Sequence, residues 1–263
     1  MKFVSWFAGI GGADLGLERA GWECVGQVEI DPFCRAVLTK HWPKVPKLED
    51  VRTVRGDEFG PFDFLVAGFP CQDVSNAGLR AGISAPRSGL YGQVVRCLRV
   101  VRPLGALLEN VAALLGRGMG TVLGDLAEIG YDTEWDCVPA SAVGAPHQRD
   151  RIFIVANRQS AGEQRLVSWA DIGSSGQWLW GGEKDLQLIA HAPHERTDRW
   201  PEPIVCRVDD GIPGRVDRIE SLGNAIVPQV AEVVGRAINK AVEPTPPPRA
   251  KWAGIGEAWR SEK

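Results

Sequence analysis

The chain has 263 residues, with 30 lysines and arginines against 33 aspartates and glutamates and a formal net charge of −3. Hydrophobic residues make up 44% and charged residues 24%, which is typical of a globular domain and excludes a disordered or collagen-like chain. The net charge argues against a protein that coats nucleic acid through charge spread over its whole surface, but it is compatible with a local basic groove.

The sequence indicates neither export nor a disulfide framework. Its first residues, MKFVSWFAGIGG, hold an apolar stretch too short to span a bilayer, with glycines where a signal helix would run. Six cysteines are spread along the chain without a CxxC pair, which favours free thiols in a reducing cytoplasm. His191, His194 and Cys206 fit no zinc-binding spacing, so we expect no metal.

Apolar runs and helix signals alternate along the first 156 residues. The clearest strand is FDFLVAG at 62–68, because an almost continuous apolar run suits a strand buried on both faces. Asp31 followed by Pro32 predicts a helix start with aspartate as N-cap. In chain order we expect strands at 2–7, 24–29, 62–68, 104–109 and 151–156, and helices at 13–20, from 32, at 91–101 and at 121–129. This alternation predicts an α/β fold with a mostly parallel sheet that binds ligands at the carboxyl ends of its strands.

The sequence changes in character after residue 157. Residues 158–218 contain four tryptophans and many glycines but no long periodic segment, so we expect a small irregular insert with the tryptophans in its core. Order returns at 223–228, and Pro228 opens a helix to about residue 241 with one apolar face. The PTPPP segment at 244–248 begins an extended tail. We therefore divide the chain into 1–157, 158–216, 217–242 and 243–263.

A glycine-rich loop follows the first expected strand. The loop FAGIGG runs from Phe7 to Gly12, and its glycines let the backbone turn tightly and approach a ligand. Glu29, at the end of the second strand, suits acceptance of both hydroxyls of a ribose, and Asp50 suits acceptance from an adenine amino group. Together these positions predict a nucleoside cofactor site. The plainer interpretation is a tight turn with two solvated acids.

A cysteine in the loop after the strand at 62–68 has the setting of a nucleophile. Cys71 follows Pro70, which stiffens the backbone, in the segment GFPCQDVS. A reactive thiolate needs a fixed, partly exposed position near positive charge. Residues 80–102 supply that charge, with five arginines and no acidic residue. The plainer interpretation is a cysteine in a turn beside an arginine-rich surface helix.

Two further groups are expected at the same edge of the sheet. Glu109, in the segment ENV, ends the strand at 104–109, so its carboxyl group would face the same rim as Cys71. Arg149 and Arg151, in the segment HQRDR, are two positions apart at the start of the last strand. This spacing lets both point to one side and bind an anion or a carbonyl group. Taken singly, each arginine is explained as readily by a surface ion pair.

Taken in order, these segments resemble the cytosine-C5 DNA methyltransferase family. The resemblance rests on FAGIGG, EID at 29–31, EDV at 49–51, GFPCQDVS, RSGL at 87–90, ENV, HQRDR and GNAIVP at 223–228, and it covers roughly residues 1–156 and 217–240. It implies a doubly wound, Rossmann-like methyltransferase fold that binds S-adenosylmethionine and releases S-adenosylhomocysteine. Residues 1–157 would form the catalytic and cofactor domain, 158–216 the target-recognition region, 217–242 a segment returning to the catalytic domain, and 243–263 a flexible tail.

The resemblance also implies a mechanism. Cys71 would attack C6 of a cytosine flipped out of the duplex. Glu109 would sit against N3 and the amino group, with its pKa raised by burial so that it donates a proton, and Arg151, supported by Arg149, would reach the base carbonyl. The implied cofactor pocket comprises Phe7, Ala8, Gly9, Ile10, Gly11, Gly12, Glu29, Ile30, Asp50, Val51, Pro70, Leu90, Asn224 and Ala225. The implied DNA contacts are Gln72, Ser75, Arg80 and Arg87.

The implied partners are double-stranded DNA and a cognate restriction endonuclease that acts on the same site. The protein would be a monomeric, cytoplasmic enzyme of a prokaryote or phage, without membrane association. Three features depart from the family pattern. His147 stands where glutamine is frequent, no Arg-Leu-Gln-Gly-Phe block precedes GNAIVP, and residues 158–218 carry eight basic against ten acidic side chains. A region that reads the major groove is normally more basic.

Three other functions compete with this interpretation. A methyltransferase acting on cytosine in RNA shares the same chemistry, although the long loop between Cys71 and Leu90 and the distinct recognition region favour DNA. A catalytically inactive DNA-binding or regulatory protein would not need Cys71, Glu109 and Arg151 together. A nicotinamide oxidoreductase explains the glycine loop and Glu29 but gives Cys71, Asn110 and GNAIVP no role.

Overall fold

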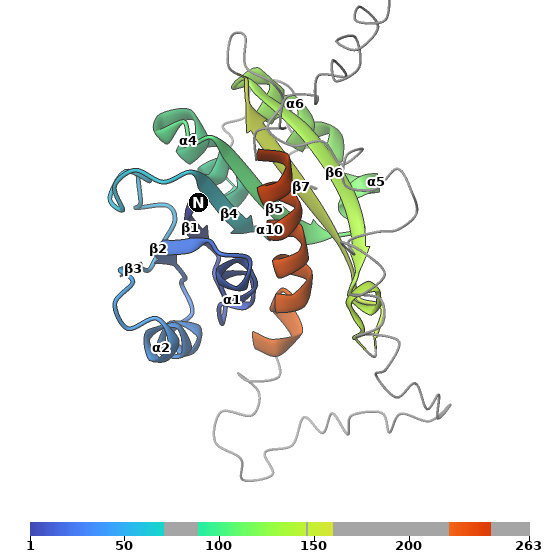
Figure 1. The fold of residues 1–263 in the computed structure, drawn as a ribbon. Helices are drawn as coiled ribbons and strands as arrows, with labels where there is room; N and C mark the ends of the chain where they lie inside the picture. Colours follow the sequence, from blue (N-terminus) through green and yellow to red (C-terminus); the bar gives the residue numbers. More distant parts are fainter. Residues whose placement is uncertain (71–88, 146, 160–220, 243–263) are drawn as a thin grey trace, which may run out of the picture.

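The computed structural model describes residues 1–70, 89–145, 147–159 and 221–242, which form a layered α/β domain (Figure 1). A seven-stranded sheet with the strand order β3-β2-β1-β4-β5-β7-β6 forms its centre. The strands are β1 (Lys2–Trp6), β2 (Glu23–Val28), β3 (Lys47–Leu48), β4 (Phe64–Gly68), β5 (Gly105–Val111), β6 (Tyr131–Pro139) and β7 (Asp150–Arg158). The helices are α1 (Gly12–Arg19), α2 (Pro32–His41), α4 (Leu90–Val101), α5 (Leu114–Arg117), α6 (Met119–Glu128) and α10 (Pro228–Val242), with a 3-10 helix η1 at Ala140–Val143.

Most strand pairs in the sheet are parallel. β1 pairs in parallel with β2 and β4, β2 with β3, and β4 with β5. β7 runs antiparallel to both β5 and β6. The predicted mostly parallel, doubly wound sheet is thus confirmed. The strand order reverses between β1 and β4, so the carboxyl ends of these two strands flank the crevice in which such sheets bind ligands.

Helices cover both faces of the sheet, and side chains of the central strands alternate between two hydrophobic clusters, one on each face. In β7, Ile152 and Ile154 belong to the cluster that includes α4 and α6. Phe153 and Val155 belong to the cluster that includes α1 and α10, and Figure 1 shows these two helices side by side. All four side chains are buried, which explains why the central strands appear in the sequence as continuous apolar runs.

The C-terminal helix α10 packs against α1, at the opposite end of the described chain. A Cβ atom at Gly16 of α1 would lie 2.2 Å from the carbonyl oxygen of Pro228, so the two backbones are in contact. The Trp22 indole donates a hydrogen bond to Asn239 Oδ1 at 2.8 Å, and Asn239 Nδ2 donates to the Ala20 carbonyl oxygen at 2.7 Å. Because these partners lie 217 and 219 residues apart, they fasten α10 to the start of the chain.

The longer elements lie within two residues of their predicted bounds, but β6 was not predicted. This strand lies at the edge of the sheet, and only Tyr131 and Val138 in it are buried. Acidic residues occupy alternate positions at 132, 134 and 136. A half-exposed edge strand lacks the apolar run that identifies a central strand.

Two of the expected regions fall outside the described residues. They are the insert at 158–216, apart from its first two residues, and the tail at 243–263. Within the described ranges, no helix is both long enough and apolar enough to cross a membrane.

Candidate functional site

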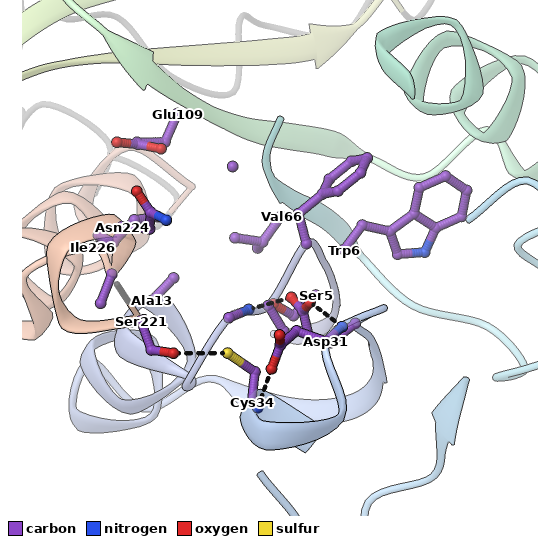
Figure 2. A pocket seen from close by; sticks show the side chains of 16 residues that line it. Ser5, Trp6, Ala13, Asp31, Cys34, Val66, Glu109, Ser221, Asn224 and Ile226 are labelled. Carbon is purple, nitrogen blue, oxygen red and sulfur yellow. Dashed lines mark hydrogen bonds between the residues drawn. The ribbon is translucent and has the colours of Figure 1, made fainter. Parts of the chain in front are cut away.

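A cavity of about 220 Å³ opens at the carboxyl ends of β1, β2, β4 and β5 (Figure 2). Its walls also include the start of α2 and the segment just before α10. The lining residues are Ser5, Trp6, Phe7, Ala8, Gly9, Ala13, Glu29, Asp31, Cys34, Val66, Gly68, Glu109, Ser221, Asn224, Ala225 and Ile226. The cavity thus occupies the crevice that a doubly wound sheet offers to a ligand. Six of the fourteen predicted cofactor residues line it: Phe7, Ala8, Gly9, Glu29, Asn224 and Ala225.

The loop after β1 depends on left-handed backbone conformations. Phe7, Gly9 and Gly11 have φ angles of 56°, 55° and 85°, which are unstrained only for glycine. Gly11 also has no space for a side chain, because a Cβ atom there would lie 2.4 Å from the Trp42 ring. Phe7 is a non-glycine residue held in this conformation at the cavity wall, and strain of this kind is characteristic of binding sites.

Glu29 supports the loop from the end of β2. Its Oε2 accepts a hydrogen bond from the Gly9 N–H at 2.7 Å, and its Oε1 accepts from the Asp31 N–H at 2.9 Å. Asp31 caps α2 by accepting from the Cys34 N–H at 2.8 Å, which confirms the predicted N-cap. Two backbone contacts therefore fix the orientation of a carboxylate in the cavity wall.

The other eight predicted cofactor residues do not line the cavity. Asp50 pairs with the Arg52 guanidinium at 2.6 Å, and the hydrogen bonds from Arg52 lower the pKa of Asp50. Ile30 is 62% exposed and Val51 is buried in the core. Gly12 contacts the backbone of the lining residue Ile226, since a Cβ atom at Gly12 would lie 2.1 Å from the Ile226 carbonyl oxygen. The remaining four are Ile10, Gly11, Pro70 and Leu90, of which Leu90 packs against the core.

Figure 2 shows Glu109 at the opposite end of the cavity from Asp31. Glu109 pairs with Gly68 across β4 and β5, and it is only 9% exposed. Its Oε1 lies 3.0 Å from Arg151 Nε. Burial raises the pKa of Glu109 to about 7, although the charges of Arg151 and Arg149 oppose the rise. Such a carboxyl group is partly protonated at neutral pH and suits general acid catalysis.

The two arginines of the HQRDR segment have different partners. Arg151 forms the ion pair with Glu109, whereas Arg149 NH2 donates a hydrogen bond to the Ala225 carbonyl oxygen at 2.8 Å. Burial, together with the nearby charge of Arg151, lowers the pKa of Arg149. The sequence predicted both arginines at this site. Only the structure shows that one binds Glu109 and the other binds the cavity wall.

Asn110 belongs to the ENV segment, but no contact was predicted for it. Its Nδ2 donates to the Phe69 carbonyl oxygen at 2.9 Å, and its Oδ1 accepts from the Val111 N–H at 2.9 Å. The side chain is 3% exposed. Asn110 therefore holds the backbone just ahead of Pro70 and Cys71. An amide beside a candidate acid at a strand end is the sequence signal for this role.

A buried polar cluster lies beside the cavity and was also not predicted. The carboxylate of Asp14, on α1, accepts hydrogen bonds from Ser5 Oγ at 3.0 Å, Gln27 Nε2 at 2.8 Å and Cys24 Sγ at 3.5 Å. Asp14 is fully buried, and burial raises its pKa. Ser5 also lines the cavity. The signal in the sequence is a polar residue at an inward position of an apolar element.

Several predicted residues cannot be placed in this geometry. Cys71, Gln72, Ser75, Arg80 and Arg87 lie outside the described residues. In the part of the chain that the structure describes, Cys24, Cys34, Cys97 and Cys137 are free thiols. Within the same ranges, no cluster of three or more His, Cys, Asp or Glu side chains suited to a metal ion occurs.

The strand order, with the glycine loop after β1 and the carboxylate after β2, defines a Rossmann-like α/β domain. Residues 1–178 match the family model described as C-5 cytosine-specific DNA methylase. The chain therefore belongs to the C-5 cytosine-specific DNA methylase family.

Individual relatives agree with this assignment. The chain is 38% identical over 165 residues to the Type II methyltransferase M2.BsuMI of Bacillus subtilis, a match that covers 60% of this chain and 42% of the relative. It is 33% identical over 228 residues to the Type II methyltransferase M.BsuFI of Bacillus subtilis, covering 82% of this chain and 53% of that protein. The chain thus spans about half the length of the curated relatives it matches.

A solved structure supports the fold. The Dnmt2 methyltransferase of S. pombe superimposes with a TM-score of 0.52 and 23% sequence identity, over 62% of this chain and 53% of that chain. Similarity at this level shows the shared architecture.

Proposed function

We propose that this chain is a DNA (cytosine-5)-methyltransferase, which transfers a methyl group from S-adenosylmethionine to C5 of a cytosine flipped out of a specific duplex sequence. The observation that carries the proposal is the setting of Glu109. A buried carboxyl group with a pKa of about 7 is paired with Arg151 at one end of a cavity. It pairs in register with the end of β4, the strand that leads into Cys71.

The cavity residues suit the chemistry of the proposed cofactor. Glu29 offers a carboxylate oriented by two backbone N–H groups, which is the acceptor that ribose hydroxyls need. A Cβ atom at Gly9 would meet no atom within 4 Å, so the loop leaves open space beside this carboxylate. When bound, S-adenosylmethionine supplies an electrophilic methyl group on a sulfonium. Asn224 and Ala225 would form the facing wall.

The protein groups would then act in sequence. The Cys71 thiolate adds to C6 of the cytosine while Glu109 donates a proton to N3, which turns C5 into an enamine-like carbon. C5 would then take the methyl group and give its proton to solvent, the C6–sulfur bond would break to release the Cys71 thiolate, and N3 would return its proton to Glu109. A positioned acid contributes typically about 10²–10⁴-fold to such a step. Arg151 would hold Glu109 and reach the base carbonyl, and flipping the base costs a few kcal/mol.

The remaining assignments in this proposal rest on the family resemblance. Residues 158–216 would recognise the target sequence, and Gln72, Ser75, Arg80 and Arg87 would contact the DNA. A restriction endonuclease acting on the same sequence would be the genetic partner, in a prokaryotic or phage-encoded system of the cytoplasm. Residues 80–90 carry Arg80 and Arg87 and no acidic residue, which is the charge that phosphate contacts need. The other three arginines of 80–102 are bound elsewhere: Arg96 donates to the Val51 and Val54 carbonyl oxygens, Arg99 pairs with Glu128, and Arg102 donates to the Ile129 carbonyl oxygen.

The test is a methylation assay with tritiated S-adenosylmethionine and PCR-amplified, unmethylated duplex DNA long enough to contain every hexanucleotide. Wild type should place label at C5 of cytosine. Cys71→Ser should abolish labelling while S-adenosylhomocysteine still binds. Cys137→Ser is the matched control, because Cys137 is a partly exposed free thiol on the edge strand β6, and it should leave labelling unchanged.

Three results would change the proposal. Cofactor binding without label in DNA, but with label in transfer RNA added as competitor, would show an RNA methyltransferase. Binding of DNA and cofactor without label in either, and without a covalent complex on DNA that contains 5-fluorocytosine, would show an inactive binding protein. Full activity of Cys71→Ser would overturn the covalent mechanism.

A further inference from the structure

Arg149 lies where the strand β7 meets the wall of the cavity. It immediately precedes β7 and has a φ angle of 41°, in the left-handed region that side chains other than glycine rarely adopt. From this position its NH2 group donates to the Ala225 carbonyl oxygen at 2.8 Å, while Arg151 reaches Glu109. An energetically unfavourable backbone conformation is thus retained together with a side-chain contact to the cavity wall.

The segment held by Arg149 touches both sides of the cavity. Asn224, Ala225 and Ile226 all line it, and Figure 2 shows Asn224 and Ile226 between Glu109 and the Ser221–Cys34 contact. On one side, a Cβ atom at Gly12 would lie 2.1 Å from the Ile226 carbonyl oxygen. On the other side, a Cβ atom at Gly68 would lie 3.7 Å from Ile226 Cδ1 and 3.1 Å from Glu109 Oε2. A shift of this segment would therefore change the packing against the glycine loop and beside Glu109.

Arg149 also acts on Glu109 through its charge. Of the described side chains, Arg151 and Arg149 are the two whose charges favour the ionised form of Glu109. The acidic groups in the wall, Glu29 and Asp31, come from the end of β2 and the start of α2. Figure 2 shows Asp31 at the far end from Glu109. Arg149 is therefore in direct contact with the cavity wall and electrostatically coupled to the proposed acid.

We propose that Arg149 is a positioning residue that fastens the 224–226 wall of the cofactor pocket to β7, and thereby couples binding in that pocket to the proton-donating state of Glu109. This inference rests on the proposed function. It differs from a direct contact between Arg149 and the cytosine, because it predicts that Arg149 affects cofactor binding when no DNA is present. It also predicts that the cofactor and the protonation of Glu109 influence each other to the same extent.

The first measurement is calorimetric binding of S-adenosylhomocysteine to the full chain without DNA. Arg149→Gln should weaken binding about tenfold, which corresponds to about 1.4 kcal/mol. Arg149→Lys should fall between the variant and wild type, because it keeps the charge but loses the planar donor group. Arg158→Gln is the matched control: Arg158 ends the same strand and donates to the Arg102 carbonyl oxygen at 2.6 Å, away from the cavity. It should leave binding unchanged.

The second measurement is the pH profile of methylation. Removing the positive charge of Arg149 raises the pKa of Glu109, so the alkaline limb of the Arg149→Gln profile should move to higher pH. The limb of Arg149→Lys should stay near that of wild type. A role confined to stability would lower the melting temperature in Arg149→Gln and Arg158→Gln alike without moving this limb.

The outcomes separate this inference from the proposed function. Wild type that binds no S-adenosylhomocysteine would overturn the proposed function itself. Wild type that binds normally, together with unchanged affinity in Arg149→Gln, would overturn the inference alone and assign Arg149 to the base. Weakened affinity with an unmoved alkaline limb would overturn the coupling to Glu109. If Arg149→Gln does not fold, Arg149→Lys provides the test. The inference predicts that Arg149→Lys binds S-adenosylhomocysteine more weakly than wild type while the alkaline limb of its pH profile stays in place. Wild-type affinity in Arg149→Lys would contradict the inference.

Discussion

Replacing Gly16 by alanine adds one methyl group at the point where α1 and α10 touch. The new Cβ atom would lie 2.2 Å from the Pro228 carbonyl oxygen and 2.6 Å from the Ala231 Cβ, both well inside van der Waals contact. A backbone oxygen in a helix cannot move alone, so α10 would have to shift away from α1. Overpacking of this kind typically lowers the free energy of unfolding by about 1–3 kcal/mol.

Gly124 provides the matched control, because it lies in the helix α6 and a Cβ atom there would meet no atom within 4 Å. Alanine in an open helical position is favoured over glycine by about 1 kcal/mol. Gly124→Ala should therefore be more stable than wild type. Gly16→Ala gains the same helix propensity but also carries the overpacking cost, so the two variants should differ by about 1–3 kcal/mol. Urea unfolding measures the difference, provided that the m-values agree. Equal stability of the two variants would refute the close packing of α10 on α1.

Three further predictions concern carboxyl groups. Glu109 must be protonated to donate a proton, and burial raises its pKa to about 7, so the rate of methylation should fall above about pH 7. Glu109→Gln should be slow at every pH and should not show this fall. If the variant's rate still falls at alkaline pH, that fall belongs to another group. Glu29→Ala removes the acceptor for two backbone N–H groups and should weaken S-adenosylhomocysteine binding about 10–100-fold by calorimetry, and wild-type affinity would place the ribose elsewhere. Burial raises the pKa of Asp14 above its unfolded value, so its contribution to stability is present at low pH and is lost as the pH rises through the folded pKa. The free energy of unfolding of Asp14→Asn should therefore increase relative to wild type between pH 4 and pH 8, and a difference independent of pH would contradict the effect of burial.

The central part of the fold follows from local patterns in the sequence. β4 and the central residues of β5 and β7 are apolar because helices cover both of their faces, and this makes each strand recognisable without knowledge of its neighbours. The start of α2 also follows from a local pattern. Asp31 accepts a hydrogen bond from the N–H of Cys34, three residues later, and Pro32 occupies the first turn of the helix. β6 is paired on one side only and carries acids at exposed or half-exposed positions, so no single residue pattern distinguishes it from a loop.

The candidate site was only partly predictable, because several of its contacts join residues that are distant in sequence. Their spacing predicts that Arg149 and Arg151 lie together at the start of one strand, and Arg149 in fact immediately precedes β7. The carbonyl group that Arg149 binds belongs to residue 225, which no spacing indicates. Asp14 is acidic at a position of α1 that is buried only because β1 and β2 lie beneath it. The role predicted for Asp50 fails for a local reason, since Arg52, two residues away, already binds its carboxylate. Long-range burial and local competition are both invisible in a motif.

The walls of the cavity come from two parts of the chain that are far apart, residues 5–109 and residues 221–226. Closing the loop between them has an entropic cost that grows with the logarithm of its length, about 0.6 kcal/mol for each doubling. By contrast, a single methyl group at Gly16 is expected to cost about 1–3 kcal/mol, since α1 and α10 meet at backbone distance. The length of the connection between β7 and residue 221 is therefore weakly constrained, while the surfaces that it brings together are strongly constrained. Longer relatives can accordingly share this architecture, and changes in residues 160–220 that spare these contacts would leave the cavity intact.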